Sequence, residues 1–173
     1  TTPTPEMRAA MAAAEVGDDV FGEDPSVNRL ERLGADVLGK EQALFLPSGT
    51  MANLIAFLVQ TRPGDTAILC EDAHPYRFEG GNFARFGGLL PRLLAGVHGK
   101  LEVEAIAQAI EQKDDPHFSP TTLVSIENTT NLGGGAYYSS EEVASIGTLC
   151  RARGLRLHCD GARIFNAAIA QQI

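Results

Sequence analysis

The sequence predicts an α/β fold with a mainly parallel sheet and helices on both of its faces. Short apolar runs of strand length alternate with segments of helical periodicity, and this alternation is typical of parallel sheets that are connected by helices. The predicted strands are Ala43–Leu46, Thr66–Cys70, Leu89–Leu94, Leu123–Glu127 and Leu155–Cys159. The predicted helices between them are Met51–Gln60, Glu102–Gln112 and Glu141–Arg153.

Two further helices are predicted before the first strand. A cap residue followed by proline begins each of them, at Thr4 and at Asp24. Gly17 and Gly39 follow the two periodic segments and can end them. The acidic loop between the helices, residues 18–24, is interpreted as solvated, with a functional role as the alternative.

The chain is expected to form one domain, because it contains no internal repeat and no low-complexity linker. Within it we expect a helical arm over about residues 1–40 and a sheet region over about residues 41–173. The last segment, Ile164–Ile173, is predicted to be helical and stops without a cap or a breaker. We therefore expect the domain to be incomplete.

Charge and composition exclude several classes of partner. The net charge of −8 and the absence of a basic patch argue against nucleic acid and anionic membrane, which both need clustered positive charge. No apolar run could span a bilayer and no secretion signal is visible, so a cytoplasmic location is expected. Cys70, Cys150 and Cys159 lack metal-type spacing, which favours reduced thiols and no metal site.

The stretch Leu155–Phe165 carries the most informative polar residues. An apolar strand runs into Asp160, which should lie at the carboxyl end of the sheet, where open α/β sheets bind ligands. A carboxylate there can hold a proton on a heteroaromatic nitrogen, and Arg163, about one helical turn on, can hold an anion. The alternative is that Asp160 only caps the next helix while Arg163 makes a surface ion pair.

A second candidate comes after the first predicted strand. Ser48, Gly49 and Thr50 can offer hydroxyls and backbone N–H groups at a helix N-terminus, where a phosphate is favoured. The turn is neither a Walker loop nor a dinucleotide fingerprint, since the required lysine and spaced glycines are absent. A plain capped turn would explain these residues equally well.

His74 comes after the strand Thr66–Cys70, and its imidazole can stack on an aromatic ligand at the same sheet edge. Alone, a surface or core histidine is the more common interpretation. Taken together, however, a phosphate site, a stacking ring and an acid for a ring nitrogen are the three groups that pyridoxal 5′-phosphate requires. The acid keeps the ring nitrogen protonated, and the ring then withdraws electrons from the substrate α-carbon.

The chain resembles the amino-terminal half of the low-specificity L-threonine aldolases, members of the β-eliminating lyase group with the aspartate-aminotransferase-like fold type I. The stretches that carry this resemblance are Val16–Pro25, Phe45–Asn53, Glu127–Asn131 and His158–Ala167. The resemblance implies a pyridoxal 5′-phosphate enzyme that cleaves a β-hydroxy-α-amino acid, such as L-threonine or L-allo-threonine, to glycine and an aldehyde. It also implies a dimer or tetramer with shared active sites.

The resemblance also implies a role for each candidate residue. Ser48, Gly49 and Thr50 match the phosphate-binding turn, and His74 matches the residue that stacks on the pyridine ring. Asp160 matches the carboxylate paired with the ring nitrogen. Arg163 matches an arginine that helps to hold the substrate carboxylate.

Three departures from the family pattern affect the expected activity. The lysine that carries the cofactor in the family lies beyond Ile173, and Lys40, Lys100 and Lys113 look like ordinary lysines. Thr130 stands where most members have a histidine near the substrate hydroxyl, and threonine cannot act as a base near neutral pH. Phe21 stands where an active-site tyrosine is common.

The last two departures are on the substrate side, so we expect altered substrate or stereochemical preference, or weak activity, with the cofactor retained. Two alternatives stay open. One is a lyase or racemase that uses the same cofactor for β-elimination or racemisation, because cofactor contacts alone do not choose which bond breaks. The other is a catalytically inactive fragment, favoured by the missing lysine.

Overall fold

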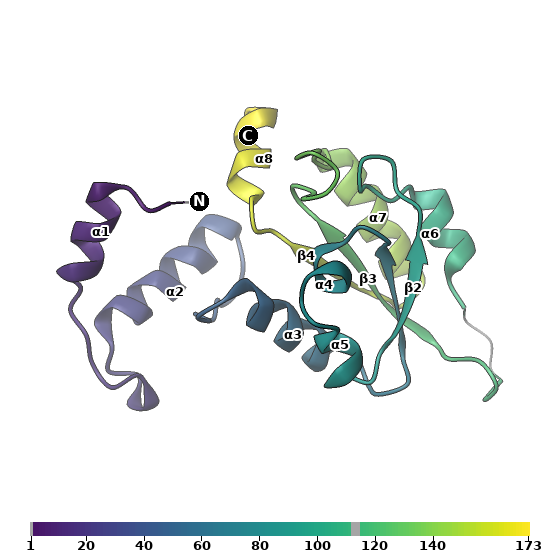
Figure 1. The fold of residues 1–173 in the computed structure, drawn as a ribbon, viewed down its shortest axis with the longest axis horizontal. Coiled ribbons are helices and arrows are strands. Elements are labelled where there is room, and N and C mark those ends of the chain that lie inside the picture. The colour runs from purple at the N-terminus through teal and green to yellow at the C-terminus, as the bar shows by residue number, and fades with distance from the viewer. Residues whose placement is uncertain (1, 112–114) are drawn as a thin grey trace. The chain divides into compact units, whose positions relative to one another are not determined.

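A computed structural model describes residues 2–111 and 115–173 of the chain. The chain divides into two compact units, Thr1–Pro47 and Ser48–Ile173 (Figure 1). Lys113 and the predicted helix end at Gln112 lie outside the described residues. No helix in the described ranges combines the length and the apolar character that crossing a bilayer requires.

The N-terminal unit contains helices α1, Pro5–Ala12, and α2, Pro25–Leu38, with a short 3-10 helix η1, Asp19–Phe21, between them. Both predicted caps are confirmed, since the side chains of Thr4 and Asp24 accept hydrogen bonds from the first-turn amides. The predicted end of α2 is also confirmed: Gly39 adopts the left-handed conformation, with φ 60°, at the helix C-terminus.

The predicted end of the first helix at Gly17 is wrong, because α1 ends at Ala12. Gly17 instead meets the chain that leads into α2, where its amide donates to Asp24 Oδ2 at 3.1 Å. A Cβ at position 17 would overlap the carbonyl of Glu23. The glycine is therefore required for a close backbone approach and not for ending a helix.

The predicted strand Ala43–Leu46 is also wrong, since this segment pairs with no strand in the described part of the chain. Its amide at Phe45 donates to the side chain of Glu31 at 2.7 Å. A strand is stable only with a hydrogen-bonded neighbour, and a run of four apolar residues does not reveal whether one is present. Leu44 and Phe45 are exposed here.

The other predicted strands are confirmed and form one parallel sheet in the second unit. They are β1, Thr66–Cys70; β2, Leu90–Leu94; β3, Thr121–Glu127; and β4, Arg156–Asp160. The strand order is β2-β1-β3-β4, and every pairing is parallel. The register places Glu127 beside Asp160, so both carboxylates stand at the carboxyl edge of the sheet.

The helices of this unit lie where the sequence predicts them, with two short additions after β1, but the helix predicted over Glu102–Gln112 already ends at Ala109. They are α3, Gly49–Gln60; α4, His74–Arg77; α5, Asn82–Arg85; α6, Val103–Ala109; α7, Ser140–Ala152; and α8, Ile164–Gln171. Ser139 and Glu142 form a capping box at the start of α7.

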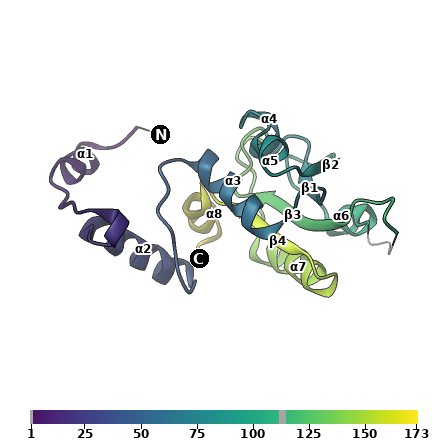
Figure 2. The same ribbon diagram turned by 90° about the horizontal axis from the view of Figure 1, so that it is seen from below.

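The helices cover both faces of the sheet, as Figures 1 and 2 show. Neighbouring residues of β4 point to opposite faces: Leu157 lies near Gly147 of α7, whereas His158 contacts Phe57 of α3. α6 packs beside α7, and α5 packs beside α3. Between these layers lies a core that includes Phe57, Ile68, Leu69, Phe83, Ile106, Leu123, Val124 and Ile146.

The strand order creates a topological switch point between β1 and β3. From β1 the chain passes to β2 on one side, and from β3 it passes to β4 on the other side. Connections that leave adjacent strands in opposite directions open a crevice beyond the carboxyl ends of those strands. The polar residues at the ends of β1, β3 and β4 surround this crevice.

Candidate active site

A cavity of about 250 Å³ lies at the carboxyl edge of the sheet. It is somewhat smaller than the roughly 300–1,000 Å³ of typical ligand pockets. Its walls come from the second unit alone and are formed by Gly49, Thr50, Asn53, His74, Glu79, Glu127, Asn131, Asp160, Ala162 and Arg163. The cavity therefore joins five of the residues that the sequence singles out: Gly49, Thr50, His74, Asp160 and Arg163.

Asp160, the last residue of β4, uses its two carboxylate oxygens differently. Oδ1 accepts from the amide of Ala162 at 3.1 Å, and Oδ2 accepts from Asn53 Nδ2 at 2.8 Å. Asp160 is not the cap of α8, because Arg163 occupies that position. The carboxylate is thus held by two donors beside the cavity and remains able to accept a further bond from a ligand.

Glu127 ends β3 and ties together the loops on either side of the cavity. Its Oε1 accepts from the amide of Asn131 at 2.9 Å, and its Oε2 accepts from the amide of His74 at 3.3 Å. Burial raises the pKa of the Glu127 carboxyl above its ordinary value, although these two amides oppose the shift. This side chain fixes where His74 begins α4.

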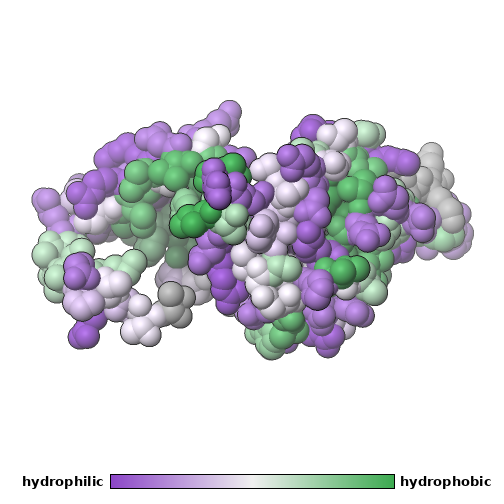
Figure 3. All heavy atoms as spheres, turned by 90° about the horizontal axis from the view of Figure 1, so that it is seen from above, coloured by the Kyte–Doolittle hydropathy of each residue, from purple (hydrophilic) through white to green (hydrophobic). Residues whose placement is uncertain are grey.

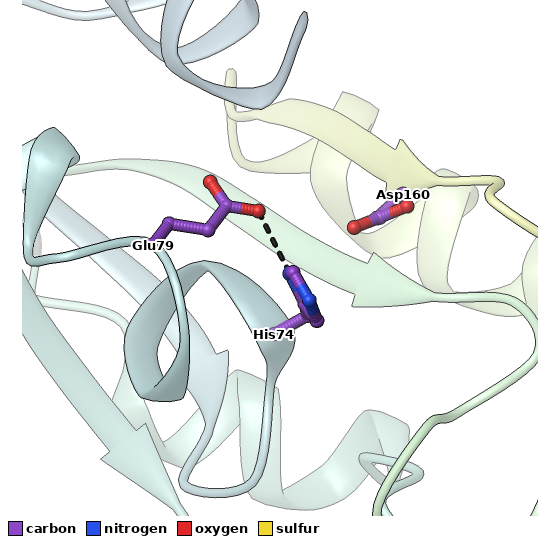
Figure 4. A group of neighbouring side chains, drawn as sticks. All are labelled: His74, Glu79 and Asp160. Carbon is purple, nitrogen blue, oxygen red and sulfur yellow. Dashed lines mark hydrogen bonds and ion pairs between the residues drawn. The ribbon is translucent and has the colours of Figure 1, made fainter. Parts of the chain in front are cut away.

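The imidazole of His74 is oriented by a buried carboxylate. Figure 4 shows the contact between His74 Nδ1 and Glu79 Oε1, whose separation is 2.9 Å. Glu79 is only 5% exposed, and the same Oε1 accepts from Asn53 Nδ2 at 2.8 Å. Because an ionised carboxylate can only accept, His74 must carry a proton on Nδ1 in this arrangement.

His158 lies on the same face of β4 as Asp160, behind the cavity. Its Nε2 is 3.0 Å from Asn53 Oδ1, and its ring meets Phe57 edge to face at 5.0 Å. Burial lowers the pKa of His158, with the Asp160 carboxylate acting in the opposite direction, so the ring is neutral at neutral pH.

The opposite wall of the cavity is the N-terminus of α3. Ser48 caps this helix, since its Oγ accepts from the amide of Met51 at 3.2 Å. The amides of Gly49 and Thr50 belong to the first turn, where a helix leaves its N–H groups without an internal partner. A Cβ added to Gly49 would meet no atom within 4 Å, so an anion can approach this backbone closely.

Within the second unit, Ser48 and Thr130 are singled out by the sequence but do not line this cavity. Thr130 is 1% exposed, and its hydroxyl donates to the carbonyl of His98 at 2.9 Å, with the Ala136 carbonyl at 3.2 Å. Phe21 belongs to η1 in the N-terminal unit and is 74% exposed. Arg163, by contrast, lines the cavity, with Nη2 3.4 Å from Asn131 Oδ1.

The ligand atoms of His74, Glu79 and Asp160 lie within 4.8 Å of one another, which is the proximity that a metal site requires. The amide of Asn53, however, donates from Nδ2 to both carboxylates at 2.8 Å. A cation between these oxygens would meet the positive end of that amide. Hydrogen bonding therefore accounts for this cluster, and we do not propose a metal.

Four polar lining residues are not predicted as site residues from the sequence: Asn53, Glu79, Glu127 and Asn131. Three of them fall within the stretches that carry the family resemblance, which was the available signal.

A larger cavity, of about 510 Å³, lies between the N-terminal ends of α6 and α7. In this cavity, Lys100 donates from Nζ to the two carboxylate oxygens of Glu142 at 2.6 and 2.8 Å. The cavity lacks the set of polar side chains that surrounds the smaller one.

A parallel sheet with a polar cavity at its switch point places this chain among the α/β proteins that bind ligands beyond the carboxyl ends of their strands. Within that class it belongs to the beta-eliminating lyase family, whose sequence model matches residues 1–173. The fold is that of the threonine aldolase and aminotransferase-like structures.

The chain is 45% identical over 173 residues to the probable low-specificity L-threonine aldolase 2 of Arabidopsis thaliana, with 98% of this chain and 49% of that protein covered. It is 44% identical over 171 residues to the low specificity L-threonine aldolase of Escherichia coli strain K12, covering 98% of this chain and 50% of that protein.

Among solved structures, a threonine aldolase of Leishmania major matches with a TM-score of 0.84 and 29% identity. The match covers 97% of this chain and 49% of that one. The chain thus spans about half the length of the curated relatives that it matches.

Proposed function

We propose that this chain carries the pyridoxal 5′-phosphate site of an aldolase that cleaves a β-hydroxy-α-amino acid to glycine and an aldehyde. The observation that carries the proposal is the position of Asp160. Its Oδ2 is bound to Asn53 at 2.8 Å and faces a cavity that also contains His74 and the N-terminus of α3. The names of the two relatives given above, both low-specificity L-threonine aldolases, support the reaction.

The residues around the cavity fit this cofactor in charge and in kind. The open first turn of α3 at Gly49 and Thr50 would hold the phosphate, and the imidazole of His74 would stack on the ring. Asp160 would accept from the protonated ring nitrogen. When bound, the cofactor withdraws electrons from the α-carbon of the substrate, which makes a bond to that carbon easier to break.

The residues around the cavity would stabilise the charged groups of the cofactor and of the substrate. Asp160 would keep a proton on the ring nitrogen, because a neighbouring carboxylate favours the charged form of a basic nitrogen. The exposed guanidinium of Arg163 lies at the cavity wall, where it can bind the substrate carboxylate in a bidentate manner. Thr50 adds a hydroxyl donor beside the phosphate position.

The substrate proposed is L-threonine or L-allo-threonine. Full-length protein loaded with pyridoxal 5′-phosphate should release glycine and acetaldehyde in equal amounts from one or both. The Asp160→Ala variant should lose about 100-fold or more of this activity. Asp72→Ala is the matched control, since Asp72 pairs with Arg77 at 3.3 Å and does not line the cavity.

Other products would lead to the alternatives. A keto acid and ammonia would mark a β-eliminating enzyme, and inversion at the α-carbon without an aldehyde would mark a racemase. Absence of any product from a protein that binds the cofactor would mark an inactive member of the family.

We further propose that the protein is a cytoplasmic homo-oligomer and that both units belong to one large domain. Support for an oligomer comes from α2, where Leu30, Leu33 and Val37 recur at helical spacing and are each at least 50% exposed. Figure 3 shows apolar surface, in green, over the N-terminal unit at its left. The three free thiols support a reducing compartment.

A further inference from the structure

Asn53 is hydrogen-bonded to the carboxylates of Glu79 and Asp160 and to the imidazole of His158, behind the cavity. It lies in the second turn of α3 and is 5% exposed. Its Nδ2 donates to Glu79 Oε1 and to Asp160 Oδ2, both at 2.8 Å, while its Oδ1 lies 3.0 Å from His158 Nε2. One side chain therefore links residues that come from the loop after α4 and from β4.

The chemistry of these groups allows only one arrangement of protons. An amide NH2 group only donates and an amide oxygen only accepts, so turning the Asn53 amide over would place its oxygen against two carboxylates. With Nδ2 toward the carboxylates, His158 must donate from Nε2 to Asn53 Oδ1. Glu79 then accepts from both Asn53 and His74 Nδ1.

We propose that Asn53 and Glu79 are positioning residues for the cofactor. Asn53 holds the Asp160 carboxylate in place at the cavity, where it would accept from the ring nitrogen, and it separates this carboxylate from that of Glu79. Glu79 holds His74 as the tautomer that carries its proton on Nδ1, with the ring plane fixed for stacking. This inference rests on the proposed function, since it takes the pyridine ring as the group between His74 and Asp160.

The two roles lead to different signatures in the protein without its cofactor. Asn53→Ala removes the acceptor of His158 but leaves Glu79 in contact with His74. Glu79→Ala removes the acceptor of His74 but leaves Asn53 in contact with His158 and Asp160. If Asn53 and Glu79 only packed the interior, their substitution would lower the melting temperature, and neither variant would change the tautomer of one histidine and leave that of the other intact.

The experiment uses the full-length protein and compares Asn53→Ala, Glu79→Ala and the control Asn166→Ala, which changes an exposed asparagine of α8. Nitrogen-15 NMR at about pH 8, above the ordinary histidine pKa of about 6.5, reports which ring nitrogen is protonated. We expect Glu79→Ala to change the tautomer of His74 alone and Asn53→Ala to change that of His158 alone. The control should match the wild type.

Titration with pyridoxal 5′-phosphate is the second readout. Each of the two variants should weaken binding by about 10- to 100-fold, by analogy with the loss of groups that orient metal ligands. The inference is overturned if both tautomers stay as in the wild type, or if both variants bind the cofactor as tightly as Asn166→Ala. Failure of the wild type to bind the cofactor would instead overturn the proposed function, and the NMR result would still decide whether the contacts exist.

Discussion

Thr130 shows the structural role of a fully buried hydroxyl in this protein. It is 1% exposed, and its Oγ1 donates to the carbonyl of His98 at 2.9 Å. A Cβ on Gly99 or on Gly133 would come closer than 3.0 Å to the Thr130 side chain. Thr130 therefore fastens the loop after β3 to the loop before α6, and the larger histidine ring of the family pattern would need space that this arrangement does not offer.

Thr130→Val tests this role because valine keeps the shape and removes the hydroxyl. We expect a loss of about 1 kcal/mol, since the His98 carbonyl loses its donor. For a protein of this size, that corresponds to a melting temperature lower by about 2–4 °C. Thr148→Val, at an exposed position of α7, is the control and should have little effect. An unchanged melting temperature together with lost threonine cleavage would show that the hydroxyl acts on the substrate.

At the level of single residues, the site residues that the sequence predicts stand next to a strand or helix end, although Glu127, which also ends a strand, was given no role. Asp160 and His74 could be found because each stands at or just after the end of an apolar strand, and Gly49 because it begins a helix. Glu79 gave no such signal: it is five residues beyond His74 in a loop, and only the folded chain brings its carboxylate to Asn53 at 2.8 Å. Distances of this kind depend on tertiary structure and not on local periodicity.

Helix α2 depends on a single carboxylate at its N-terminus. Asp24 Oδ1 accepts from the amides of Ser26 and Val27, both at 2.9 Å, and Oδ2 accepts from Gly17 at 3.1 Å. These amides lower the pKa of the Asp24 carboxyl below its ordinary value. The stabilisation they give is complete above the ordinary pKa and is lost as the pH falls through the lowered one.

The chemical shifts of the amide protons of Ser26, Val27 and Gly17 should therefore change together with pH. Their common midpoint reports the Asp24 carboxyl and should lie below the ordinary value of 3.8. NMR spectra recorded across the acidic range measure this midpoint directly. Asp24→Asn should abolish the shared titration, whereas Asp36→Asn, at an exposed position of the same helix, should leave it intact. A midpoint at or above 3.8 in the wild type would contradict the proposed charge-assisted cap.

Among the elements, the helices with several independent signals were predicted correctly, and so were the apolar runs that have a hydrogen-bonded neighbour in the sheet. α2 and α7 have a cap, a periodic apolar face and a glycine at or just beyond their ends, and β1 and β3 are apolar runs that the structure buries. Ala43–Leu46 had only its apolar character. Because a strand is defined by its neighbour, that segment could not be distinguished from an extended connection.

For the molecule as a whole, the exposed face of α2 predicts self-association. Light scattering on the full-length protein should give a mass that is an integral multiple of the polypeptide mass. Leu33→Gln should raise the dissociation constant by at least about 10-fold, because burying a leucine side chain contributes about 1.5–3 kcal/mol. Arg29→Gln, exposed on the same helix, is the control. A monodisperse monomer would contradict the proposal.

Family membership could be predicted from the sequence because the residues that carry it are grouped in short stretches around the sheet edge. The reaction could not be derived in the same way, since the contacts of Asp160, His74 and Gly49 would serve several reactions on one cofactor. Which bond breaks depends on groups that hold the substrate. Thr130 does not contribute such a group to the described cavity.

Equilibrium titration of the purified protein with pyridoxal 5′-phosphate is the most direct test of the cofactor site. We expect one cofactor per chain, weaker binding of pyridoxal, which lacks the phosphate, and binding weakened by about 10-fold or more in Asp160→Ala, since a hydrogen bond to a charged group contributes about 1.5–3 kcal/mol. Equal affinity for the cofactor and for pyridoxal, or equal affinity of the wild type and Asp160→Ala, would contradict the assignment of this cavity.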